Sequence, residues 1–311
     1  MVIKMGSSSI PNGLLSLSLA VFLLLGVVSA HPKEPFISYH NGPLLTGNVS
    51  LAVLWYGEFL PVEKTVVRSF VESLSMEKSL SFQSDVHSWW QKVHSYLELA
   101  EKKKRSKGVK VRIDREVDDE NASLGRVLGN ESLPVLLKKA TFGLANAVAV
   151  VFVSKEVKMA EACEVPCYQH GALGKQIYIV VGNQEKECPG SCGVPFHRSI
   201  NRDLPPTAVT LEPPSGNGGA DAMVIHFASA LAETVTNPFN NGFFSTSFGQ
   251  ESQAARVCMG YFASGAFPGY PGNVRVDPYT GGAFNAHGLK NSKFLLPALW
   301  DPKTDDCWTV L

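Results

Sequence analysis

The first thirty residues constrain this chain most, because they determine the compartment in which the remainder folds. Lys4 gives a small positive start, and an uncharged run dominated by Leu, Val and Ala follows over residues 14–28. This run has about 15 residues, fewer than the roughly 20 that a membrane-spanning helix needs, and small residues suited to signal peptidase follow it up to Ala30. The sequence therefore predicts a signal peptide, residues 1–30, and a secreted chain, residues 31–311, with no membrane span after cleavage. A retained signal anchor is the alternative, although no second apolar run is long enough to span.

Six cysteines follow the predicted cleavage point, and an even number in a secreted chain indicates disulfides. They are Cys163, Cys167, Cys188, Cys192, Cys258 and Cys307. Six cysteines allow fifteen connectivities, of which we favour Cys163–Cys167, Cys188–Cys192 and Cys258–Cys307. The last bond would tie the C-terminal tail to the body of the protein. Structural zinc at the two C-x3-C pairs is the alternative, and an oxidising compartment disfavours it.

Three N-x-S sequons, at Asn48, Asn121 and Asn130, predict glycosylation in a secreted chain. The charge balance argues against nucleic acid as a partner, because the 28 Lys and Arg are matched by 28 Asp and Glu. Removal of Lys4 with the signal peptide leaves 27 basic against 28 acidic residues, a net charge of −1. Hydrophobic residues at 45% and charged residues at 18% are typical of a globular protein and exclude wholesale disorder.

Apolar periodicity predicts an α/β body with the order β-α-α-β-α-β-β-loop-α. Short apolar or alternating runs predict strands, and 3.6-residue periodicity predicts helices, the first of them with Pro61 in its first turn. The expected elements are a strand over 50–56, helices over 61–74 and 85–103, a strand over 109–113, a helix over 132–140, strands over 147–153 and 176–181, a loop over 197–219 and a helix from Asp221, as its cap, to about Val235.

The character of the chain changes after Asn237. Residues 260–288 contain seven glycines interleaved with aromatic residues, a composition typical of turns and loops. A mainly apolar run follows over 294–300. We therefore expect a single α/β domain, with a mixed sheet flanked by helices and a loop-rich C-terminal extension that the Cys258–Cys307 disulfide ties down.

Familiar catalytic motifs are absent from the sequence. Residues 171–176 are too short for a P-loop and lack its Ser or Thr, and neither G-x-G-x-x-G nor G-x-S-x-G occurs. The basic run over residues 102–107 is predicted to be a solvated helix end, with contact to an acidic wall polysaccharide as the alternative.

The helix predicted from Asp221 carries the most suggestive polar residues. At 100° per residue, Met223, Val224, Phe227, Ala230 and Leu231 form a core stripe, and three polar residues lie together beside it. These three residues are His226, Ser229 and Glu233. A zinc hydrolase would carry H-E-x-x-H or H-E-x-x-E here, whereas this chain has Ser229 and Ala230 in place of the first ligand and the base. A zinc site would need partners from elsewhere, and His170, His197, His226 and Glu233 are the candidate set.

Five motifs of the mature chain resemble the EXORDIUM-like, or phosphate-induced, protein family of plants. They are Tyr39–Ser50 with the following Trp55–Gly57, Cys188–His197, Thr234–Gly242, Gly265–Gly272 and Leu295–Pro302. The resemblance covers nearly the whole mature chain. Two departures indicate a divergent member: His226, where the family's helix more often has Asn, and the looser segment 163–170.

The resemblance implies a secreted, apoplastic protein linked to brassinosteroid-dependent growth and development and to carbon status. It implies no defined reaction and no catalytic residue. We therefore expect a non-enzymatic regulator without a cofactor, whose partner is extracellular, either a cell-wall polysaccharide or a receptor ectodomain.

The alternative is a noncanonical metallohydrolase that uses zinc. Residues 231–238 are similar to the LAEAVTDP that follows the metal-binding histidine in some zincin-type peptidases, and the element order is compatible with a zincin-like arrangement. This second resemblance implies a scaffold of that kind with a degenerate metal site.

Overall fold

The computed structural model describes residues 37–75, 86–100, 108–159, 163, 167–200, 208–247 and 250–311. The predicted signal peptide and the basic run over 102–107 lie outside the described residues. Residues Ile37–Leu311 form one compact unit. Within the described part, no helix combines the length and apolar character needed to cross a membrane.

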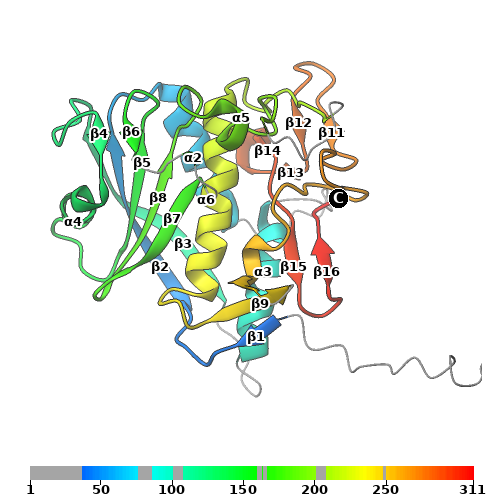
Figure 1. Cartoon of the computed structure of the whole chain (residues 1–311), viewed down its shortest axis with the longest axis horizontal. Helices are drawn as coiled ribbons and strands as arrows, with labels where there is room; N and C mark the ends of the chain where they lie inside the picture. The colour runs from blue at the N-terminus through cyan, green and yellow to red at the C-terminus, as the bar shows by residue number, and fades with distance from the viewer. Residues whose placement is uncertain are drawn as a thin grey trace, which may run out of the picture. The chain divides into compact units, whose positions relative to one another are not determined.

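A five-stranded mixed sheet is the centre of this unit (Figure 1). Its strands, in spatial order, are β3 (Val109–Asp119), β2 (Gly47–Tyr56), β5 (Val148–Val153), β8 (Gln176–Gly182) and β7 (Tyr168–Leu173). The first four are parallel to their neighbours, and the edge strand β7 is antiparallel to β8. Every residue of β5 is buried, which is typical of a parallel strand with both faces covered.

Helices cover both faces of the sheet, and alternation along β2 shows which residues meet which layer. Leu51, Val53 and Trp55 contribute to a large core with the helices α2 (Pro61–Leu74), α3 (Val86–Ala100) and α6 (Gly218–Thr236). Leu54 and Tyr56 contribute to a smaller core on the opposite face with α4 (Leu133–Thr141). Figure 1 shows the two helical layers on either side of the strands. This arrangement confirms the predicted mixed sheet flanked by helices.

Helix α6 is more deeply buried than the sequence predicted. It contacts β7 and β8 on one side and α2, α3 and the 3-10 turn η2 (Ala254–Arg256) on others, so a single apolar stripe does not describe it. Its cap is Asn217, whose side chain accepts a hydrogen bond from Ala220 N at 2.8 Å. The prediction of Asp221 as the cap was wrong by one turn, because that side chain is buried and accepts from Ser215 instead.

The predicted order of elements is confirmed, and the additional elements are short. Pro61 is the first residue of α2, as expected. The sequence did not predict the edge strand β7, and β3 extends six residues beyond the predicted end at Ile113. The two-residue strands β4 (Val127–Leu128) and β6 (Lys158–Met159) pair with each other in parallel. The short helices η1 (Asn130–Ser132) and α5 (Pro189–Cys192) complete the body.

The C-terminal extension is built from very short paired strands. They are β9 (Phe243–Ser247) and β10 (Gln250–Gln253), which form one sheet with β1 (Ile37–Tyr39) from the N-terminal end of the unit, and the pairs β11 (Arg275–Val276) with β12 (Ala283–Phe284), β13 (Ala286–His287) with β14 (Lys293–Phe294), and β15 (Leu299–Asp301) with β16 (Asp306–Trp308), with η3 (Leu289–Asn291) before β14. The Cys258–Cys307 disulfide is present, as predicted. Hydrogen bonds from Trp89 Nε1 to Pro297 O (2.7 Å) and from Tyr96 OH to Trp300 O (2.6 Å) also fasten the extension to α3.

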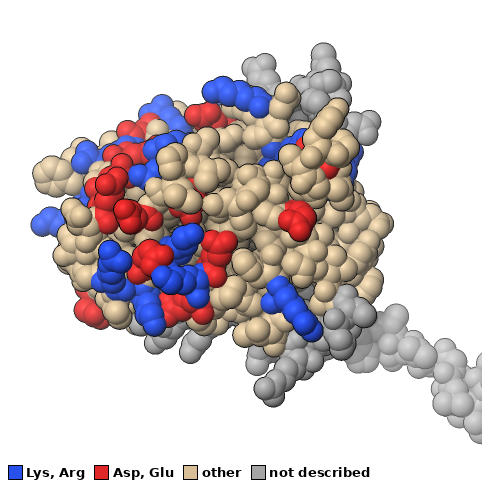
Figure 2. Space-filling view, turned by 90° about the horizontal axis from the view of Figure 1, so that it is seen from above, with Lys and Arg blue, Asp and Glu red and all other residues tan. Residues whose placement is uncertain are grey.

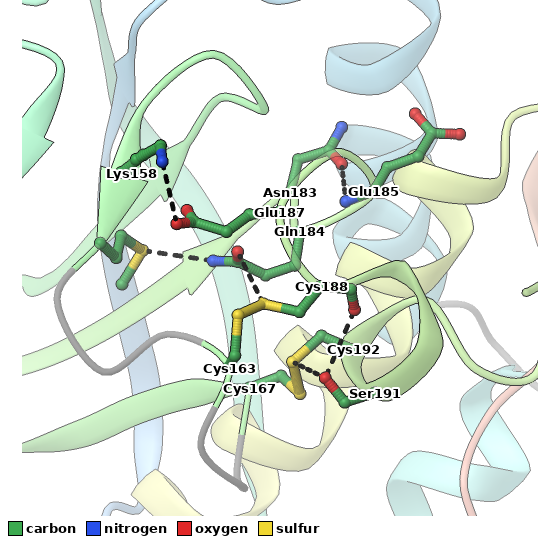
Figure 3. Close-up of a disulfide and its surroundings, with 11 residues drawn as sticks. Lys158, Cys163, Cys167, Asn183, Gln184, Glu185, Glu187, Cys188, Ser191 and Cys192 are labelled. Atoms are coloured by element: carbon green, nitrogen blue, oxygen red, sulfur yellow. Dashed lines mark hydrogen bonds and ion pairs between the residues drawn. A yellow bond between two sulfur atoms is a disulfide. The ribbon is translucent and has the colours of Figure 1, made fainter. Parts of the chain in front are cut away.

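Two of the three predicted disulfides were wrong. The bonds join Cys163 to Cys188 and Cys167 to Cys192, with Cα–Cα distances of 5.6 and 5.5 Å. Cys192 N donates to Cys188 O across the single turn of α5. Residues four apart on a helical turn lie on the same face, so both sulfurs point to the neighbouring segment rather than to each other (Figure 3).

Candidate functional site

A cavity of about 400 Å³ lies between α6 and the loop over residues 257–271. Its walls are mainly apolar, and aromatic rings and prolines supply much of them: Tyr168, Tyr261, Phe262, Phe267, Tyr270, Pro195, Pro268, Pro271 and Pro297. Cavities of this size with apolar walls and a few polar groups are typical of small-molecule sites. We therefore treat this cavity as the candidate functional site.

Helix α6 supplies two of the polar groups of the cavity. Between Gly219 and Thr236 every residue is buried except His226 and Ser229, and both line the cavity. They are three residues apart and so lie on one face of the helix. The sequence had placed these two residues on one face with Glu233, and the structure shows that they open into a cavity.

The hydrogen bonds of His226 and Ser229 determine what each can offer a ligand. His226 Nε2 lies 2.7 Å from Cys192 O, and because a carbonyl only accepts, Nε2 must carry the hydrogen. Burial lowers the pKa of His226, while that hydrogen bond raises it by less, so the neutral ring is favoured and Nδ1 is its acceptor. Ser229 Oγ donates to Ile225 O at 3.2 Å, which leaves its lone pairs as acceptors.

The described walls of the cavity carry no carboxylate, ammonium or guanidinium group. Among the described residues that line it, none is Asp, Glu, Lys or Arg. Figure 2 shows the same tendency over a wider surface: on the face in view, charged side chains gather on the side of the sheet, and the side of the C-terminal extension is mostly free of them.

Glu233, one turn further along α6, is held in a buried ion pair. Arg256 donates from Nε to Oε1 (2.9 Å) and from Nη2 to Oε2 (2.8 Å), and Tyr168 OH donates to Oε1 at 2.8 Å. His170 Nε2 lies 3.1 Å from Oε2 and 2.8 Å from Gln253 Oε1. Burial by itself raises the pKa of the fully buried Glu233 carboxyl, but the hydrogen bonds from His170 and Arg256 outweigh it and hold that pKa below its usual value.

This ion pair supports one wall of the cavity. Arg256 belongs to η2, which leads directly into the 257–271 loop, and its guanidinium lies 5.3 Å from the centre of the Tyr168 ring. Tyr168 itself lines the cavity. A bidentate arginine–carboxylate contact fixes orientation as well as distance, so Glu233 positions this loop against α6.

The structure does not assemble the four zinc candidates. His170 contacts Glu233, but the other two candidates have different partners. His226 Nε2 is hydrogen-bonded to Cys192 O, and His197 Nε2 lies 3.8 Å from Glu185 Oε1. Across the described ranges, no group of three or more His, Cys, Asp or Glu could hold a metal ion. In addition, Arg256, Tyr168 and His170 already contact the two oxygens of Glu233. The metallohydrolase alternative is therefore not supported.

Sequence reasoning did not identify Tyr168, Arg256 or the aromatic residues of the 257–271 loop as parts of the site. One feature could have pointed to Arg256: a glutamate in an otherwise apolar helix is rarely buried without a partner of opposite charge. The sequence does not show which of the distant basic residues is that partner. The predicted glycosylation sites Asn48, Asn121 and Asn130 are all exposed.

Comparison with known proteins identifies relatives over almost the whole described unit. The sequence model of the family described as "Phosphate-induced protein 1 conserved region" matches residues 37–310. The chain is 37% identical to Protein EXORDIUM of Arabidopsis thaliana, over 92% of this chain and 93% of that protein. It is 38% identical to Protein EXORDIUM-like 2 of the same plant (90% and 91% covered) and 36% identical to Protein PHOSPHATE-INDUCED 1 of Nicotiana tabacum (90% of each). No solved structure gives a significant match, so the zincin-like arrangement is not confirmed.

Proposed function

Because the chain belongs to the phosphate-induced protein 1, or EXORDIUM-like, family, we propose that it is a secreted, apoplastic regulator that acts by binding and not by catalysis. It acts in brassinosteroid-dependent growth and development and in the response to carbon status. Its partner is extracellular, a cell-wall polysaccharide or a receptor ectodomain, and the cavity beside α6 is where a ligand controls that contact. It requires no resident cofactor.

Three features support an extracellular location. All six cysteines are paired, in two bonds that clamp α5 and one that ties down the C-terminal extension. Such a set of disulfides is typical of an oxidising compartment. The predicted signal peptide and the exposed sequons, which we expect to carry glycans, agree with this location.

The observation that supports a binding role is the different environment of the polar residues along α6. His226 and Ser229 face a mostly apolar cavity, while the carboxylate of Glu233 is enclosed by Arg256 and Tyr168. To act as a general base or a metal ligand, the Glu233 carboxylate would need a free lone pair directed at the substrate. Glu233 instead uses its oxygens to hold the cavity wall in place, which suits recognition.

Growth rescue in a plant line that lacks this protein tests the proposal. The key variant is the double substitution Glu233→Gln with Arg256→Gln, which replaces the ion pair by two neutral amides that still hydrogen-bond. We expect this variant, where it is secreted and folded, to restore growth to within about twofold of the natural chain, because removing both charges of a buried pair costs far less than removing one.

Two controls accompany this rescue experiment. Ser95→Ala removes a helical hydroxyl far from the cavity in sequence, on α3, and should rescue fully. The natural chain should be recovered from the medium with a mass that falls after enzymatic removal of N-linked glycans. Retention of the natural chain inside cells, or a folded and secreted double variant that fails to restore growth, would contradict the proposal.

A further inference from the structure

We infer that the cavity beside α6 binds an uncharged ring compound through a hydroxyl group whose single hydrogen is shared between the acceptors of His226 and Ser229. This inference specifies the ligand class for the proposed binding function and rests on it. Its test measures ligand binding by the purified protein, so that it can fail while the role in growth stands, or the reverse.

The two polar positions on α6 are the first step of the argument. A helix that is otherwise buried from Gly219 to Thr236 leaves only His226 and Ser229 accessible, and both open into the same cavity. Burial of a polar side chain without partners is costly. Two neighbouring polar residues on an otherwise buried helix therefore mark a point where a ligand's polar group belongs.

The hydrogen-bond roles of these two residues give the chemistry of that group. The hydrogen of His226 Nε2 goes to Cys192 O and the hydrogen of Ser229 goes to Ile225 O. What remains on both side chains is acceptor capacity, on Nδ1 and on Oγ. A ligand that pairs with them has to bring the hydrogen, as a hydroxyl group does.

The lining excludes a charged ligand. An ionised group in this cavity would lose water without meeting a carboxylate, ammonium or guanidinium group, because none of the described lining residues is Asp, Glu, Lys or Arg. The cost of such burial exceeds that of a neutral hydroxyl by a wide margin. Arg256, the cation nearest in sequence to the 257–271 loop, is already neutralised by Glu233.

The shape and composition of the walls favour a ring over a long chain. Phe267 and Tyr270 lie with ring centres 5.1 Å apart at the cavity, and Phe267 is 56% exposed. Flat aromatic and proline faces match the flat faces of a rigid ring, which loses little conformational freedom on binding.

Binding of three matched probes to the secreted protein tests the inference by calorimetry at about pH 6. Naphthol has the ring and the hydroxyl, methoxynaphthalene lacks the donor, and naphthoate carries a charge. We expect naphthol to bind, methoxynaphthalene to bind about fivefold more weakly because it cannot donate, and naphthoate to bind at least about tenfold more weakly because its charge is not compensated.

Variants locate the binding and show which atoms accept. Ser229→Ala should reduce the preference for naphthol over methoxynaphthalene to about twofold, the part that His226 retains. Ser229→Leu should obstruct the part of the cavity next to His226 and abolish binding of both probes. Ser95→Ala is the matched control, since Ser95 also donates to a carbonyl of its own helix, and it should bind like the natural chain.

The outcomes separate the two proposals. The inference is overturned if naphthoate binds as tightly as naphthol, if the probes do not bind, or if Ser229→Leu leaves naphthol binding unchanged. The role in growth is judged only by the rescue experiment. A Ser229→Leu chain that loses the probes yet restores growth would support this ligand chemistry and contradict the cavity as the site of growth control.

Discussion

At the scale of single residues, Glu233 shows how one pattern can serve two purposes. The sequence places it on the same face of a helix as His226 and Ser229, and that spacing is also found in metal-binding helices. The structure divides the three: two open into the cavity and the third meets Arg256. The angular position of a side chain follows from the sequence, but the identity of its partner depends on segments that arrive from elsewhere.

Arg256→Ala should destabilise the protein strongly. It leaves the fully buried Glu233 without its cation, and breaking one side of a buried pair costs about 3–5 kcal/mol. The free energy of unfolding in urea measures the loss. Arg256→Lys keeps the charge but loses the bidentate geometry and should cost clearly less. A loss below about 1 kcal/mol in Arg256→Ala would show that the pair contributes little to the fold.

The same pair predicts how this loss depends on pH. In the natural chain the pKa of Glu233 lies below its usual value, so its contribution to stability is present above the unfolded pKa and is lost as the pH falls through the folded pKa. In Arg256→Ala burial dominates and should raise that pKa instead. The stability difference between the two chains should therefore shrink between about pH 7 and about pH 4. A difference that stays constant over this range would contradict the assignment.

Asp221 predicts a pH dependence of the opposite sign. Burial raises its pKa to about 7, and hydrogen bonds from the backbone and side chain of Ser215 offset only part of that effect. Between the unfolded pKa of about 3.9 and the folded value, the folded state holds a proton that the unfolded state has released, so stability falls as the pH rises. Asp221→Asn should remove this slope, with a gain of about 2–4 kcal/mol at pH 8 and little change at pH 4. Denaturation of both chains, measured side by side at the two pH values, gives their free energies of unfolding. An equal change of this free energy with pH in the two chains would contradict the prediction.

At the scale of elements, the short helix α5 decides the disulfide connectivity. From the sequence alone, the nearest partner of each of these four cysteines is the other cysteine of its C-x3-C pair, so a disulfide within each pair is the simplest prediction. One helical turn between Cys188 and Cys192 changes this, because it turns both sulfurs to the same side, toward Cys163 and Cys167. A four-residue helix carries too little periodicity to be predicted, and so the pairing could not be.

A non-reducing digest distinguishes the two connectivities. A protease that cleaves after glutamate separates Cys163 from Cys167 at Glu164 but leaves Cys188 and Cys192 together in one peptide. The observed bonds predict that three peptides stay linked, with residues 162–164 and 165–185 both attached to the peptide that begins at Cys188. Pairing within each C-x3-C would instead release that peptide alone. Mass spectrometry before and after reduction gives the answer.

At the scale of the whole molecule, the sequence predicted what continuous patterns encode. The buried strands, the long helices and their order were correct because each carries its own apolar periodicity. The paired two-residue strands of the extension were not predicted, since an element so short has no period to detect. The cavity also escaped prediction, because its two sides, α6 and the 257–271 loop, are joined by the Glu233–Arg256 contact between separate segments.

The metal content of the whole protein is the last prediction, and the donor atoms determine it. A bound zinc ion takes about four ligands, whereas His226 Nε2 and both oxygens of Glu233 already have protein partners. A metal at Glu233 would have to displace Arg256 and leave its guanidinium partly buried without a counter-charge, which is costly. Native mass spectrometry of protein secreted from plant cells, never exposed to a chelator, should therefore show only the polypeptide and its glycans. One zinc ion per chain, lost in Glu233→Gln but kept in Ser95→Ala, would mean that the ion pair opens in the native protein and would bring hydrolysis back into consideration.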